Sequence, residues 1–253
     1  MNVHVDVLGG GRDLVLLHGW GLNADVWSEV VPLLAARMRV FAVDLPGHGR
    51  SPDPGIDDFD ETVDAVAARV PKDAVVCGWS MGGLFAQRLA ARHPSRVRGL
   101  ALVAGTPRFV AGGDWPHGMR GETLERFARD LEADRDATLA TFVTLNALHG
   151  SRGRAAAREF ARRIAARPPA TDAALRRGLA WLRRIDLRGD APRLSMPALV
   201  MHGARDALVP AEAGRWLAGT LPDARHIEWP DAAHLPFFTH RAEFVATLES
   251  FVA

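Results

Sequence analysis

The chain has 253 residues, a length that suits one large domain with room for an inserted subdomain. Its hydrophobic content of 48% is sufficient for a full core, and a net charge of only +1 argues against a nucleic-acid-binding protein. The single cysteine, Cys77, excludes an intramolecular disulfide. The N-terminal segment lacks the apolar stretch of a signal peptide, and no run approaches the roughly 18 apolar residues of a membrane helix. We therefore expect a soluble cytoplasmic monomer with no membrane partner.

Short apolar runs rich in Val and Leu recur along the chain, at 13–17, 39–43, 74–78, 99–104 and 197–202. Runs of this length and composition are typical of strands that are buried on both faces of a parallel sheet. Helical patterns lie between and after them, at 61–70, 81–92, 212–220 and 241–252. This alternation predicts a doubly wound α/β sheet with helices on both faces.

One region interrupts the alternation, because from about 108 to 188 there is no convincing strand. Four amphipathic helical segments take its place, at 122–134, 136–150, 153–167 and 171–185. We therefore expect an α/β core made of 1–107 and 189–253, with residues 108–188 inserted as a helical cap.

Charge is unevenly distributed within the predicted cap. Residues 114–136 hold seven acidic residues and four Arg, whereas 152–188 hold eleven Arg and three acidic residues. The second half of the cap is therefore expected to present a local basic surface, although an Arg-rich amphipathic helix can also do no more than solvate its outer face.

Residues 78–82 read GWSMG, directly after an apolar run and directly before a helical pattern. A G-x-S-x-G sequence in this setting is typical of the nucleophile elbow of an α/β-hydrolase. The sharp turn from strand to helix exposes the Ser80 hydroxyl, and the flanking glycines let the neighbouring backbone approach. The helix that follows offers the Met81 N–H to a developing oxyanion. We therefore predict that Ser80 is a nucleophile.

A serine nucleophile needs a base, and the base needs an acid that fixes its tautomer. In this fold the acid and the histidine follow the serine in that order along the chain. Asp206 comes just after the run 197–202, where a loop leaves the carboxyl end of a strand, and His234 lies shortly before the last helix. Ser80, Asp206 and His234 are thus the predicted catalytic triad, and this chemistry requires no metal and no cofactor.

The segment LHGWG at 17–21 follows the first apolar run and occupies the place of the second oxyanion loop of this fold. Its position makes the Trp20 N–H the second donor and the Trp20 indole a wall of the acyl pocket. His18 and His48 are interpreted as structural hydrogen-bonding groups in their loops, and Cys77 as a buried, inert thiol.

Four segments, at 18–27, 43–51, 78–83 and 195–210, resemble the α/β-hydrolase superfamily. HGWGLNA, GWSMGGL and the segment around DWP at 114–116 more narrowly resemble the pimeloyl-[acyl-carrier protein] methyl ester esterase family of biotin synthesis, essentially from end to end. That resemblance implies a serine esterase that hydrolyses the methyl ester of a pimeloyl chain tethered to acyl carrier protein.

Carried over by position, the resemblance assigns Ser80, Asp206 and His234 to the triad. It assigns Trp20 and Met81 to the oxyanion loop and acyl pocket, and Phe142 to contact with the acyl chain. Arg154 and Arg158 match two cap positions that engage the acidic carrier protein. Two further arginine positions of the family are Ala137 and Thr141 here, for which Arg135, Arg162 or Arg163 are candidate replacements.

Other activities of the same fold stay open from the sequence: a general short-chain carboxylesterase, an enol-lactonase or a C–C-bond hydrolase. Dehalogenases and epoxide hydrolases usually carry Asp at the nucleophile, which Ser80 disfavours. A catalytically inactive ligand-binding protein is also disfavoured, because the triad and both oxyanion loops are complete.

Overall fold

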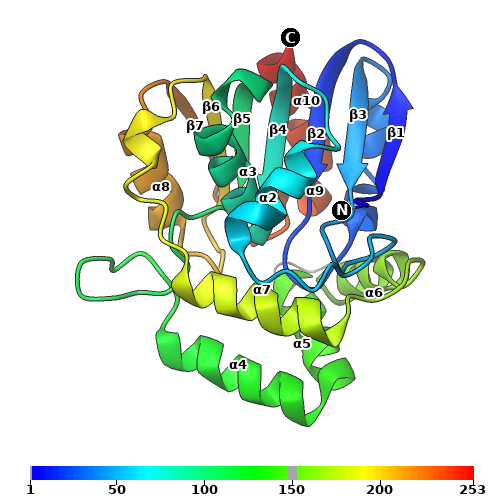
Figure 1. Ribbon diagram of the computed structural model, residues 1–253, viewed down its shortest axis with the longest axis vertical. Helices are drawn as coiled ribbons and strands as arrows, with labels where there is room; N and C mark the ends of the chain where they lie inside the picture. The colour runs from blue at the N-terminus through cyan, green and yellow to red at the C-terminus, as the bar shows by residue number, and fades with distance from the viewer. Residues whose placement is uncertain (1, 148–152) are drawn as a thin grey trace.

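The computed structural model describes residues 2–147 and 153–253, and their side chains apart from 144–147 and 153–158. Seven strands of this part of the chain form one sheet in the order β1-β3-β2-β4-β5-β6-β7 (Figure 1). Only β1 runs antiparallel to its neighbour, and the remaining pairs are parallel. The strands are β1 (Val5–Gly9), β2 (Arg12–Leu17), β3 (Met38–Val43), β4 (Ala74–Trp79), β5 (Val97–Val103), β6 (Ala198–Gly203) and β7 (Ala224–Trp229).

The central strands are buried on both faces, as their unbroken apolar sequences predict, and all six residues of β4 and of β6 are buried. One face is covered by α2 (Phe59–Ala67), α3 (Met81–Arg92) and α8 (Ala211–Thr220), and the other by η1 (Ala24–Trp27), α1 (Val31–Leu34), α9 (Pro236–Thr239) and α10 (Arg241–Val252). Two short turns, η2 (Pro94–Arg96) and η3 (Ala191–Arg193), precede β5 and β6. The doubly wound α/β arrangement predicted from the sequence is confirmed.

Four helices lie beyond the carboxyl ends of the parallel strands: α4 (Gly121–Ala133), α5 (Arg135–Ala147), α6 (Gly153–Ile164) and α7 (Asp172–Arg184) (Figure 1). Local sequence fixes where two of them begin. Asp134 accepts the Ala137 N–H at the start of α5, and the Thr171 hydroxyl accepts the Ala174 N–H at the start of α7. These helices occupy the segment 108–188 that the sequence assigns to the cap, and α4 to α7 are called the cap below.

The cap helices are bonded to the core by polar contacts as well as by apolar packing. The Trp181 indole of α7 donates to the Asp57 carbonyl at 3.0 Å, and the Asn23 amide donates to the Ile164 carbonyl at the end of α6 at 2.9 Å. Arg177 of α7 is buried and pairs with Asp53 at 2.7 Å. Each bond joins residues more than 100 positions apart, so the seating of the cap is specified by tertiary contacts.

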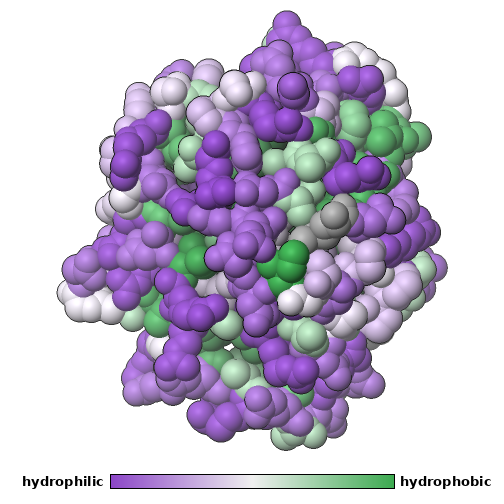
Figure 2. Space-filling view, viewed as in Figure 1, coloured by the Kyte–Doolittle hydropathy of each residue, from purple (hydrophilic) through white to green (hydrophobic). Residues whose placement is uncertain are grey.

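The surface is mostly hydrophilic in the view of Figure 2, with a hollow between α4 and α7 whose floor includes apolar side chains. None of the helices in the described part of the chain combines the length and the apolar character needed to cross a bilayer.

Candidate active site

Ser80 lies between the end of β4 and the start of α3, in a backbone conformation that side chains rarely adopt, with φ 55° and ψ −120°. Its N–H donates to the Val103 carbonyl of the neighbouring strand at 3.0 Å, which holds the turn in place. Side chains are excluded on both flanks, because a Cβ on Gly78 would lie 2.2 Å from the Gly82 carbonyl oxygen. A Cβ on Gly82 would likewise lie 2.4 Å from the Leu17 carbonyl oxygen. The local sequence therefore permits a strained elbow with Ser80 at its tip.

Asp206 and His234 come together from two loops at the carboxyl ends of neighbouring strands. Asp206 follows β6 and His234 follows β7, and His234 Nδ1 lies 2.6 Å from Asp206 Oδ2. Asp206 Oδ1 accepts the N–H groups of Leu208 and Val209, each at 2.9 Å. Both carboxylate oxygens are thus occupied, and the imidazole is held in one orientation.

The surroundings of Asp206 keep it ionised. Burial alone would raise the pKa of this carboxyl, but its interaction with the His234 ring and the hydrogen bonds from His202 and His234 lower it well below its ordinary range. A permanent carboxylate beside Nδ1 requires the proton on Nδ1, which leaves Nε2 of His234 as the basic nitrogen. Nε2 is buried and has no hydrogen-bond partner among the described residues. It is therefore free to accept a proton.

Ser80 and His234 line the same pocket, of about 100 Å³, between the sheet and the cap. Ser80 is 6% exposed and His234 is 1% exposed, so bulk water has little access to either. The structure thus places Ser80 and the Asp206–His234 pair at one pocket, with no hydrogen bond between Ser80 and His234. Within the described residues, no three His, Cys, Asp or Glu side chains form a group that could hold a metal ion.

The rest of the pocket wall is mostly apolar, and among its described lining side chains only His234 can carry charge. Trp20 and Phe142, both predicted from the sequence, line it. The remaining lining residues were not singled out by sequence reasoning: Phe109, Met119, Thr123, Leu124, Phe127, Leu179, Leu182, Leu208 and Val209. Most come from the cap or the loops beside it, where an amphipathic pattern marks a buried face without saying what that face encloses.

Trp20 connects the loop after β2 with the cap. Its indole Nε1 donates to the Leu175 carbonyl of α7 at 2.9 Å, and its ring lies edge-on to both Phe127 and Phe142, with centroids 5.2 Å apart in each pair. As the first residue of α3, Met81 carries an N–H that has no acceptor inside the helix. The Met81 side chain is fully buried and packs toward Gly178 of α7.

His18 and Cys77 occupy structural positions. His18 is fully buried; its Nε2 accepts the Leu45 N–H at 2.9 Å, so its Nδ1 carries the proton and donates to the Gly19 carbonyl at 2.8 Å. Burial lowers the pKa of His18 to about 4, which keeps the ring neutral. Burial raises the pKa of the Cys77 thiol, so it is not a thiolate at neutral pH.

The arginines in the second half of the cap are less available than their number suggests. Arg154 and Arg158 belong to α6, but their side chains lie outside the described residues. Most of the described arginines there are engaged in ion pairs: Arg162, Arg163, Arg167, Arg177, Arg183 and Arg188. Arg135, a candidate replacement, is likewise paired, with Asp136 and Asp172. Most of the described arginines in this stretch therefore form ion pairs within the protein.

Comparison with known proteins agrees with this geometry. The model of the alpha/beta hydrolase fold family matches residues 14–241. The chain is 43% identical over 250 residues to the pimeloyl-[acyl-carrier protein] methyl ester esterase of Chromobacterium violaceum, covering 98% of this chain and 97% of the relative. It is 41% identical over 250 residues to the same-named esterase of Nitrosomonas europaea, covering 98% and 99%. An esterase from Exiguobacterium antarcticum of known structure superposes with a TM-score of 0.89 at 25% identity, covering 99% of this chain and 95% of the other.

Three findings lead to one assignment. The family model covers most of the chain, and relatives above 40% identity match it over nearly its full length. The structure adds a serine at a turn between a strand and a helix, in the same pocket as an Asp–His pair. The chain belongs to the α/β-hydrolase family and, within it, to the family of the pimeloyl-[acyl-carrier protein] methyl ester esterases.

Proposed function

We propose that this protein hydrolyses the methyl ester of a pimeloyl chain carried on acyl carrier protein, and so releases methanol and the free pimeloyl carboxylate in biotin synthesis. The observation that carries the proposal is the position of Ser80 and the unpartnered His234 Nε2 in one apolar pocket closed by the cap. The names of relatives above 40% identity supply the substrate.

In the first half of the reaction, Ser80 Oγ attacks the ester carbonyl carbon while His234 Nε2 accepts the hydroxyl proton. The carbonyl oxygen becomes an oxyanion that accepts hydrogen bonds from the Met81 and Trp20 N–H groups. The protonated His234 then gives its proton to the departing methoxide, so methanol leaves and an acyl-enzyme remains. Asp206 stays ionised throughout and stabilises the imidazolium.

In the second half, water takes the place that methanol has left. His234 Nε2 removes a proton from the water as its oxygen attacks the acyl carbon, and the same two N–H groups stabilise the second oxyanion. Collapse of this intermediate returns the proton from His234 to Ser80 Oγ. The products of this half are free enzyme and the carrier-bound pimeloyl chain, which now ends in a carboxylic acid that ionises on release.

The pocket also favours the uncharged ester over the product. Its lining, as far as the structure describes it, offers a carboxylate no cation other than a protonated His234. An ionised carboxylate loses its hydration in such a site without compensation, which costs several kcal/mol. A methyl ester and a methylene chain carry no charge and do not pay this cost. The product is therefore expected to bind more weakly than the substrate.

We further propose that the carrier protein docks on the face of α6 that includes Arg154 and Arg158, because acyl carrier proteins are acidic and an arginine cluster would steer and orient them. We also propose that the protein acts as a monomer in the cytoplasm; the described residues of one chain supply the triad and the pocket, which supports the monomer.

The first test compares Ser80→Ala with the unchanged protein on carrier-bound pimeloyl methyl ester and on a panel of free short esters. Loss of the nucleophile is expected to lower kcat by roughly 10⁶-fold on all of them. The unchanged protein is expected to show its highest kcat/KM on the carrier-bound ester. Wild-type turnover by Ser80→Ala would refute the serine mechanism, and a higher kcat/KM on short free esters would point to a general carboxylesterase.

The second test changes charge at two places on the cap. The double variant Arg154→Glu with Arg158→Glu is expected to lower kcat/KM on the carrier-bound ester by at least tenfold while sparing a free p-nitrophenyl ester. The matched control is Arg176→Glu with Arg184→Glu. These two arginines are exposed, have no ion-pair partner among the described residues and line the hollow between α4 and α7. A selective loss in the control instead would place the carrier over that hollow.

A further inference from the structure

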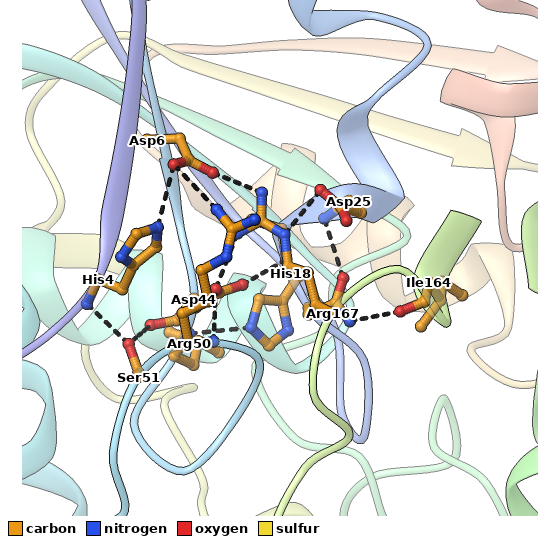
Figure 3. Close-up of polar contacts among 12 residues, drawn as sticks. His4, Asp6, His18, Asp25, Asp44, Arg50, Ser51, Ile164 and Arg167 are labelled. Atoms are coloured by element: carbon orange, nitrogen blue, oxygen red, sulfur yellow. Dashed lines mark hydrogen bonds and ion pairs between the residues drawn. The ribbon is translucent and has the colours of Figure 1, made fainter. Parts of the chain in front are cut away.

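Arg167 carries a permanent charge in a buried position, with its side chain only 7% exposed. It lies in the turn that follows α6, and its three ion-pair partners all belong to the core (Figure 3). Its guanidinium lies 2.5 Å from Asp6 of β1, 2.7 Å from Asp25 of η1 and 2.8 Å from Asp44 after β3. A buried charge is tolerated only with such partners, because an unpaired ion would lose its hydration without compensation.

Of the three partners, Asp44 is the one that is connected to the active site, through the loop that follows β3. Its side chain is fully buried and accepts the Ala24 N–H at 2.8 Å, the Arg50 N–H at 2.9 Å and Arg167 Nη1 at 2.8 Å. These bonds fix the first residues of the loop after β3. The next residue, Leu45, donates its N–H to His18 at 2.9 Å, so the position of this loop determines the position of the His18 ring.

His18 in turn fixes a peptide group of the oxyanion loop. Its Nδ1 donates to the Gly19 carbonyl at 2.8 Å. The peptide bond between Gly19 and Trp20 is planar and trans, so its N–H points opposite to its carbonyl group. Holding the Gly19 carbonyl on His18 therefore sets the direction of the Trp20 N–H, the second proposed oxyanion donor.

We infer that Arg167 is a positioning residue, which couples the seating of the cap to the orientation of the Trp20 N–H through Asp44, Leu45 and His18. The inference rests on the proposed ester hydrolysis. The cap holds this loop at a second point as well, since the Trp20 indole donates to the Leu175 carbonyl of α7. A cap that is correctly seated thus orients both the main chain and the side chain of Trp20.

Arg177 provides a matched control. It is also a buried cap arginine that pairs with a core carboxylate, Asp53, at 2.7 Å, and its guanidinium lies over the Trp181 ring. The other bonds of Asp53 are to the Gly55 N–H and the Thr171 hydroxyl. Thr171 also donates its N–H to the Gly47 carbonyl, in the loop that begins at Asp44, but no described bond joins Arg177 itself to Asp44 or His18. Arg177 therefore attaches the cap with a less direct hold on the oxyanion loop than Arg167.

The test compares Arg167→Gln and Arg167→Lys with Arg177→Gln and Arg177→Lys. For each we would measure kcat and KM on a p-nitrophenyl ester, Tm, and the inhibition constant of a trifluoromethyl ketone, which forms an oxyanion on the serine. Arg167→Gln is expected to lower kcat at least tenfold with KM within about twofold, and to weaken ketone binding in parallel. Arg167→Lys should recover part of both. Arg177→Gln should lower Tm as well, with a clearly smaller loss of kcat and of ketone binding than Arg167→Gln.

Equal losses of Tm in the two Gln variants, with kcat and ketone binding unchanged in Arg167→Gln, would overturn the inference while leaving ester hydrolysis intact. If Arg167→Gln does not fold, His18 variants extend the test. In His18→Asn the short side chain keeps an amide donor where Nδ1 lies, close to the Gly19 carbonyl. In His18→Gln the longer side chain places its amide where Nε2 lies, near the Leu45 N–H, and the donor to Gly19 is lost. His18→Gln should therefore lose more ketone affinity than His18→Asn, and equal affinities would exclude the route through His18.

Discussion

At the scale of single residues, Asp206 has the most sharply defined surroundings. Asp206→Asn keeps the shape of the side chain but removes the charge that holds the proton on His234 Nδ1. We expect kcat on a p-nitrophenyl ester to fall by about 10⁴-fold, because the amide favours the wrong tautomer. Far-UV circular dichroism and Tm serve as controls for folding. A loss of less than tenfold in a folded variant would contradict the assigned role.

The residues with a direct chemical role could be predicted from the sequence because each lies at a recognisable junction. Ser80 follows a strand within a five-residue motif, and Asp206 and His234 follow strands in the order that this fold requires. Arg167 could not be found in this way. Its partner Asp44 is 123 positions away, and an arginine near the end of an amphipathic helix looks like an ordinary solvated residue until the chain is folded.

At the scale of elements, α7 packs closely against the catalytic loops. A Cβ on Gly178 would lie 2.5 Å from Cδ1 of Trp20 and 3.3 Å from Sδ of Met81. We expect Gly178→Ala to displace Trp20 or to lift α7, with a loss of about 1–3 kcal/mol in the free energy of unfolding and a lower kcat. Urea unfolding and ester hydrolysis measure the two effects.

Gly219→Ala on α8 is the control for this substitution, because a Cβ there meets no atom within 4 Å. Alanine has a higher helix propensity than glycine, so this control should stabilise the protein, by up to about 1 kcal/mol, and leave kcat unchanged. Equal behaviour of the two variants would mean that α7 does not constrain Trp20.

The sequence predicted best those helices whose apolar residues repeat with a clear helical period and those strands that are fully buried. The helix expected at 81–92 is α3 without change, and the strand expected at 74–78 is β4 with one more residue. The strand β1 was missed, because an antiparallel edge strand is half exposed and its apolar residues do not form a run. The helix expected at 153–167 ends at Ile164, where the chain turns and brings Arg167 to the carboxylates of the core.

At the scale of the whole molecule, buried histidines make stability depend on pH. Burial lowers the pKa of His18 to about 4 and that of His48 to about 3, whereas the unfolded chain titrates near 6.5. Between these values the unfolded chain binds protons that the folded chain does not, so acid favours unfolding. Burial also lowers the pKa of His226, which adds to the same trend.

We therefore expect the free energy of unfolding in urea to be nearly constant above pH 7 and to fall below pH 6.5, by about 1.4 kcal/mol per pH unit for each of the two histidines. His48→Asn tests the origin of the slope. Its amide can replace the bond of His48 Nδ1 to the Pro46 carbonyl, which is 3.0 Å long, but it does not titrate. This variant should lose the share of the slope that His48 contributes, about 1.4 kcal/mol per pH unit at most. A free energy of unfolding that stays constant from pH 7.5 to 5.0 would show that these rings are not held neutral by burial.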